Sequence, residues 1–62
     1  MDELTYITSQ INDKITHLSD HIINGRIKTF DEYTKICGEI QGLSTAKSFI
    51  VALQDKMENS DE

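Results

Sequence analysis

The sequence predicts an all-α protein: a two-helix antiparallel hairpin that dimerises into a four-helix bundle. Proline is absent and no stretch alternates apolar with polar residues, so nothing in the chain favours strands. Apolar residues recur at steps of three and four along two long segments, which is the spacing of one face of an α-helix. A glycine and a helix-start signal separate the two segments, as expected for a turn between helices.

The first segment predicts a helix over about residues 3–24. Asp2 and Glu3 place negative charge where a helix N-terminus is stabilised by it. Asn24 and Gly25 end the segment, because a glycine just past the last periodic residue commonly adopts a left-handed conformation that terminates the helix. The apolar stripe of this helix comprises Leu4, Ile7, Ile11, Ile15, Leu18 and Ile22.

Residues 25–29 form the predicted turn, and a second helix is expected over about residues 30–58. Thr29 is its predicted N-cap. The Thr29 hydroxyl can accept a hydrogen bond from the backbone N–H of Glu32, while the Glu32 carboxylate reaches back to the backbone N–H of Thr29. Residues 59–62 have nothing to bury and are expected to fray. The whole chain, residues 1–62, is therefore expected to form a single domain.

A turn this short requires the two helices to run antiparallel. Counting back from the turn, we expect Leu18 to face Ile36 and Leu4 to face Ile50. In this register every apolar residue of the first stripe meets an apolar residue of the second helix. The second helix contributes four residues to the predicted hairpin core: Ile36, Ile40, Leu43 and Ile50.

The second helix carries more apolar surface than the first helix can cover. Residues 49–53 are all apolar, and such a wide apolar band is typical of a helix packed on two sides. Gly38 and Gly42 each cost roughly 1 kcal/mol relative to alanine inside a helix, so we expect a second chain to pack closely against them. The alternative is local, with both glycines making room for a bulky side chain of the first helix. The predicted partner interface comprises Gly38, Gly42, Phe49 and Leu53.

The small size of the chain also favours a partner. A core built from 62 residues rarely supplies more than about 3–5 kcal/mol of stability without an additional cross-link. The single cysteine, Cys37, allows no internal disulfide, and no cluster of Cys and His has the spacing of a structural zinc site. Self-association as a homodimer, or binding to a larger protein, is the remaining means of stabilisation.

The charge of the chain limits the classes of partner. A net charge of −5, from 11 acidic and 6 basic residues, argues against nucleic acid and anionic lipid. No apolar run approaches the roughly 20 residues of a membrane span, and the acidic N-terminus lacks the pattern of a secretion signal. We therefore expect a cytoplasmic protein. The acidic residues near both chain ends complement the helix dipoles and aid solubility or, alternatively, form a patch that blocks a basic site.

Few residues could support catalysis or metal binding. His17 and His21 have the spacing of two metal ligands on one helix face, with Asp13 one turn before, but a solvated flank is the simpler interpretation. Cys37 would need a nearby histidine base to act as a nucleophile, so a packing role is expected. A two-helix hairpin also offers no cavity for a small-molecule substrate. We expect no catalytic, cofactor-binding or metal-binding residues, and no enzymatic activity.

One pattern begins at the turn and continues through the second helix: Gly25, Phe30, Tyr33, Ile36, Gly38, Ile40, Gly42, Leu43 and Ala46. It resembles small, mostly uncharacterised helical-hairpin proteins encoded by tailed bacteriophages, which carry a glycine before the second helix and a Tyr…Gly-x-Ile-x-Gly-Leu core. The resemblance covers about half of the chain and supplies packing positions only. It implies a viral origin and a role in the virion or its assembly, within the host cytoplasm or the particle.

We therefore expect a non-enzymatic protein–protein interaction or structural protein. It would be a phage-encoded accessory or virion-assembly subunit that acts as an oligomeric helical hairpin. The alternative is a small acidic phage inhibitor that binds and blocks a host enzyme or defence complex. Identifying the proteins captured with this chain distinguishes the two, because capsid or portal proteins support the first and a host enzyme supports the second.

Overall fold

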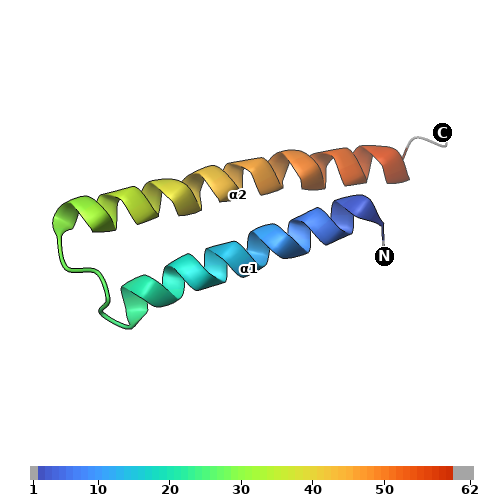
Figure 1. Cartoon of the computed structure of the whole chain (residues 1–62). Coiled ribbons are helices and arrows are strands. Elements are labelled where there is room, and N and C mark those ends of the chain that lie inside the picture. Colours follow the sequence, from blue (N-terminus) through green and yellow to red (C-terminus); the bar gives the residue numbers. More distant parts are fainter. Residues whose placement is uncertain (1, 60–62) are drawn as a thin grey trace.

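Two antiparallel α-helices, packed against each other, make up the part of the chain described by the computed structural model, residues 2–59 (Figure 1). Helix α1 spans Glu3–Ile23 and helix α2 spans Phe30–Glu58. The molecule is a rod with principal extents of 52, 19 and 13 Å. The predicted all-helical hairpin is confirmed. Of the tail predicted to fray, only Asn59 lies within the described residues, where it caps the end of α2.

Helix α1 begins with a side-chain cap. The Asp2 carboxylate accepts a 2.7 Å hydrogen bond from the backbone N–H of Thr5, one of the donors that a helix start leaves without a partner. The same backbone hydrogen bond is the main reason that the pKa of Asp2 lies below its usual value, because it stabilises the ionised carboxylate. The sequence had suggested only a favourable charge at Asp2, and the structure adds a specific hydrogen bond.

Helix α1 ends in a left-handed glycine cap, as predicted. Gly25 has a φ of +68°, a conformation that glycine adopts without steric cost. The backbone N–H of Gly25 donates to the carbonyl of Ile22 at 3.2 Å, and that of Arg26 donates to the carbonyl of His21 at 3.1 Å. This pair of bonds is the Schellman arrangement, which satisfies carbonyls that the last turn would otherwise leave free.

The start of α2 confirms one half of the predicted capping pair and corrects the other. The Thr29 hydroxyl accepts from the backbone N–H of Glu32 at 3.1 Å, as expected. The Glu32 carboxylate, however, accepts from the backbone N–H of Lys28 at 3.3 Å and not from that of Thr29. Because the backbone is extended at Thr29 (φ −133°, ψ 157°), the residue before the cap comes within reach of the carboxylate. The cap therefore also fixes the end of the turn.

The helices meet along one stripe on each, which we call the inner stripes. Their positions are spaced alternately four and three residues apart, as in a coiled coil. Leu18, 8% exposed, is the one buried side chain among residues 2–59, and the other inner positions are half-buried. The inner stripe of α1 comprises Leu4, Thr8, Ile11, Ile15, Leu18 and Ile22, and that of α2 comprises Ile36, Ile40, Leu43, Lys47, Ile50 and Gln54.

One predicted core residue lies elsewhere. Ile7 is 43% exposed and sits at the edge of the contact, while Thr8 takes the inner position. The regular four–three spacing from Ile11 back to Leu4 passes through residue 8, so packing against α2 selects Thr8 over its more apolar neighbour. The Thr8 hydroxyl oxygen is buried there without a hydrogen-bond partner.

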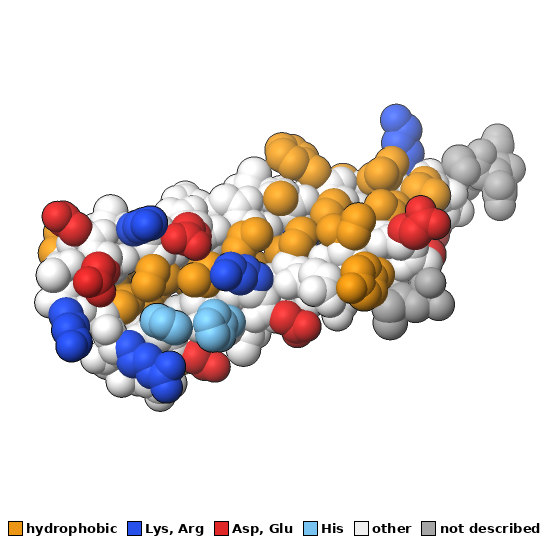
Figure 2. Space-filling model, viewed as in Figure 1, with side chains coloured by type: hydrophobic (Ala, Val, Ile, Leu, Met, Phe, Trp, Pro, Cys, Tyr) orange, Lys and Arg blue, Asp and Glu red, His pale blue; other side chains and the backbone are white. Residues whose placement is uncertain are grey.

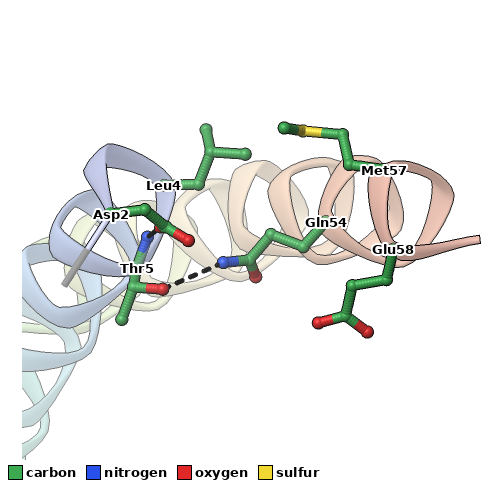
Figure 3. Close-up of a pocket in the computed structure, with 6 residues that line it drawn as sticks. All are labelled: Asp2, Leu4, Thr5, Gln54, Met57 and Glu58. Atoms are coloured by element: carbon green, nitrogen blue, oxygen red, sulfur yellow. Dashed lines mark hydrogen bonds between the residues drawn. The ribbon is translucent and has the colours of Figure 1, made fainter. Parts of the chain in front are cut away.

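The pairing of the helices at the open end differs from simple counting. Counting back from the turn places Leu4 opposite Ile50, but the amide nitrogen of Gln54 donates to the Thr5 hydroxyl at 3.3 Å (Figure 3). Gln54 is one helical turn further along α2 than Ile50. The connection continues past the end of α1, with Ile27 half-buried, so α2 begins beyond the end of α1 (Figure 1). Because of this overhang, the start of α1 lies beside residues about one helical turn further along α2 than counting back from the turn predicts.

Candidate partner interface

On each helix, the residues one position before the inner residues form a second stripe, which we call the flanking stripe. The flanking stripes of α1 and α2 lie on the same side of the hairpin. Lys14, His17 and His21 of α1 line one shallow, open hollow together with Glu32, Lys35 and Glu39 of α2. We call this side the histidine face. It comprises Glu3, Ile7, Gln10, Lys14, His17 and His21 on α1, with Lys35, Glu39, Gly42, Ala46, Phe49 and Leu53 on α2.

The opposite side of the hairpin carries mainly small polar residues. Two shallow hollows join its members across the helices: Thr5, Ser9 and Asn12 lie beside Gln54, and Asn12 also lies beside Ser44 and Ser48. We call this side the hydroxyl face. It comprises Thr5, Ser9, Asn12, Thr16, Ser19 and, at the end of α1, the exposed Ile23, with Cys37, Gln41, Ser44, Ser48, Val51 and Asp55 on α2.

The histidine face is divided along its length (Figure 2). Toward the open end it is apolar, where Ile7, Phe49 and Leu53 are 43%, 71% and 46% exposed, and Tyr6 borders Ile7. Toward the turn the histidines lie among lysine and glutamate side chains. Apolar side chains also gather where the hairpin turns, but Phe30 lies on the overhanging start of α2, where its ring stacks on Tyr33 with 6.4 Å between centroids.

The glycines of α2 leave open space in this structure. A Cβ atom added to Gly38 or to Gly42 would meet nothing within 4 Å. The local explanation, in which these glycines make room for a bulky side chain of α1, is therefore contradicted. Gly42 and Ala46 lie at the middle of the histidine face, between its charged and apolar halves, and Gly38 lies further round the helix. All four predicted interface residues, Gly38, Gly42, Phe49 and Leu53, are exposed.

The histidines and the cysteine are the side chains that the sequence singled out for metal binding or nucleophilic chemistry. The rings of His17 and His21 lie edge to face with 5.2 Å between centroids. No group of three or more His, Cys, Asp or Glu among residues 2–59 could hold a metal ion. The free thiol of Cys37 is half-buried and pairs with a tyrosine instead of a histidine. Hydrogen bonding with Cys37, followed by the charge of the thiolate, raises the pKa of Tyr33.

The open end of the hairpin combines polar and apolar groups. Asp2, Leu4 and Thr5 of the α1 end line a shallow hollow with Gln54, Met57 and Glu58 of α2, and the Thr5–Gln54 hydrogen bond lies across it (Figure 3). This hollow is open to solvent. Neither of the described helices is long and apolar enough to cross a lipid bilayer.

The sequence predicts an interface on α2 alone, whereas the structure places exposed residues of α1 on the same side of the hairpin. Ile7, predicted in the core, and His17 and His21, predicted as a solvated flank, all lie on the histidine face. The missed signal was a second four–three repeat, one residue ahead of the inner positions on both helices. Comparisons with known proteins give no further guidance: no family model, curated protein or solved structure matches this chain.

Proposed function

We propose that this protein is a non-enzymatic interaction subunit, a helical hairpin that acts by docking its histidine face onto another helical surface. The observation that carries the proposal is the apolar surface of α2 that α1 does not cover, with Phe49 71% exposed and Leu53 46% exposed. Large apolar side chains gathered on one exposed surface are typical of protein interaction sites, and aromatic residues are enriched in them.

Two further features support docking by helix packing. Phe49 and Leu53 are separated by one turn and continue the row of Gly42 and Ala46, so they form the regular projections that fit between residues of another helix. Gly42 carries no side chain, and a Cβ there would meet nothing, so a facing helix could approach closely at the centre of the row. The resemblance of the turn and α2 to phage hairpin proteins supports a role in a phage particle or its assembly.

A matched pair of substitutions tests the docking surface. Phe49→Asp and Phe30→Asp each place a charge at an exposed phenylalanine of α2, since these residues are 71% and 79% exposed, but only Phe49 lies on the histidine face. We expect Phe49→Asp to weaken association on the order of 100-fold or more, as for an aromatic anchor at an interface. Phe30→Asp should leave association unchanged.

Association is measured in two ways for both variants and the wild-type chain. Sedimentation equilibrium reports self-association, and affinity capture from extracts of the producing cells reports binding to other proteins. Circular dichroism must show equal helical content, so that loss of folding is not mistaken for loss of docking. If Phe49→Asp and Phe30→Asp behave alike in both assays, the histidine face is not the docking surface and the proposal fails.

A further inference from the structure

We infer that the surface docked on the histidine face is the histidine face of a second copy, in a parallel arrangement with both turns at the same end of a four-helix bundle. This inference rests on the proposed function and specifies its partner and geometry. A two-fold axis along the rod places α1 of each copy on α2 of the other. The flanking stripe of α1 in one copy then packs against the flanking stripe of α2 in the other.

The exposed area of the chain agrees with pairing of two such rods. The chain exposes 4971 Å², whereas a compact monomer of 7.1 kDa exposes about 4,100 Å² by the usual scaling of surface with mass. The excess of about 900 Å² is close to the roughly 800 Å² that each partner buries in a standard protein interface. The elongated chain therefore exposes enough surface beyond that of a compact monomer for one interface of standard size.

The apolar halves of the two faces match in the parallel arrangement. At the open end, Tyr6 and Ile7 of α1 would pack against Phe49 and Leu53 on α2 of the second copy, because the two stripes lie at the same height in the hairpin. These four side chains are 57%, 43%, 71% and 46% exposed in the single chain. Their mutual burial would extend the apolar core that the inner stripes begin.

The charged halves match as well. Near the turn, α1 presents Lys14 with the two histidines, whereas α2 presents the carboxylates of Glu32 and Glu39 on either side of Lys35. Stacking α1 of one copy on α2 of the other places Lys14 against carboxylates of opposite charge, which gives register and specificity. An antiparallel pair would instead cover Lys35 with the apolar half, removing water from a charge that gains no partner.

Distances between the two turns of the dimer test the orientation. A Cys37→Ser, Lys28→Cys chain carries one thiol, at an exposed position of the turn, and accepts a spin label there. Double electron–electron resonance should give a distance of about 20–30 Å in the parallel dimer, set by the width of four packed helices. An antiparallel pair would separate the labels by about the length of the rod, 52 Å. Lys56→Cys, at the open end of α2, should also give a short distance.

The outcomes separate this inference from the proposed function. A dimer with turn labels about one rod length apart overturns the parallel arrangement and leaves docking by the histidine face intact. A chain that stays monomeric, but captures another protein that Phe49→Asp fails to capture, overturns the second copy as partner and again leaves the docking surface intact. A dimer that Phe49→Asp does not weaken overturns both. Short distances at both label sites, with weakening by Phe49→Asp, support both.

Discussion

The hydroxyl face and the histidine face lie on the same two helices, but their side chains differ in whether they find partners within the chain. On or beside the hydroxyl face, Ser48 donates its hydroxyl to the Ser44 carbonyl at 3.1 Å, and Thr45 donates to the Gln41 carbonyl at 3.0 Å. These hydroxyl groups find partners within their own helix. The histidine face presents exposed apolar side chains, such as Phe49, and water cannot satisfy these in the same way.

This difference shows how a hairpin with almost no buried core can favour one partner surface. Only Leu18 is buried among the described residues, so both faces depend on a thin line of half-buried contacts. Small polar residues on one side cost little when left in water, and large apolar ones on the other side gain from being covered. The distribution of side chains, more than their number, therefore makes the histidine face the side that would gain most from being covered.

The largest effect is expected from breaking the scaffold that the two faces share. Leu18→Ala should destabilise the hairpin by about 3 kcal/mol, because it removes the one buried apolar side chain and leaves a cavity. Both faces would be lost together. Urea unfolding followed by circular dichroism measures the change. A variant that keeps wild-type stability would show that the inner stripes do not hold the hairpin together.

Adding a bulky side chain at either of two neighbouring positions tests the two faces separately. Gly42→Leu adds a side chain at the centre of the histidine face, and Gln41→Leu adds one on the hydroxyl face. Nothing lies within 4 Å of the Gly42 Cβ position in the single chain, so this substitution should stabilise the isolated hairpin by up to about 1 kcal/mol through helix propensity.

Only one member of this pair, Gly42→Leu, should affect association. If the α1 backbone of a second copy packs against Gly42, the Gly42→Leu side chain should weaken the dimer by roughly 30-fold or more, as overpacking does. Gln41→Leu should leave the dimer unchanged. Sedimentation equilibrium and thermal unfolding of both variants provide the measurements, and a dimer strengthened by Gly42→Leu would place the interface elsewhere.

Reversing single charges tests the polar half of the histidine face. Lys14→Glu and Glu39→Lys each bring like charges together near the turn, so each variant should dimerise less well with itself. Mixed in equal amounts, the two variants should form heterodimers about tenfold more tightly than either homodimer. Native mass spectrometry measures the proportions. Asp55→Lys, on the hydroxyl face, is the control and should show no preference for a partner.

The smallest effect is expected from the Asp2 cap at the start of α1, which stabilises the hairpin and therefore both faces equally. The pKa of Asp2 is lowered by the Thr5 backbone N–H, so the ionised cap stabilises the fold at pH values above the ordinary aspartate pKa of 3.8. That stabilisation should be lost as the pH falls through the lowered value. Asp2→Asn keeps a capping side chain without this titration. The difference in melting temperature between the two proteins should therefore change between pH 6 and pH 2, and a constant difference would exclude a role for ionisation.

Local features of the fold were predictable because their causes lie within a few residues. The Thr29 hydroxyl cap and the left-handed Gly25 each follow from the identity of one residue and its immediate neighbours. The exposure of Phe49 and Leu53 was predictable because the apolar band of α2 is wider than one neighbouring helix can cover. The return bond of Glu32 was misplaced by one residue, because its partner depends on the path of the turn.

The sequence by itself determined that this chain forms two helices, where they begin and end, and that α2 is too apolar to be covered by α1 alone. Helix periodicity and capping are local, so they can be read without knowing what lies opposite. Only the tertiary structure decided that Thr8 lies inside while Ile7 lies at the edge, that Gln54 meets Thr5, and that both helices contribute to one face. These features depend on the overhang of α2 at the turn, since a shift of one helical turn changes which side chains face each other.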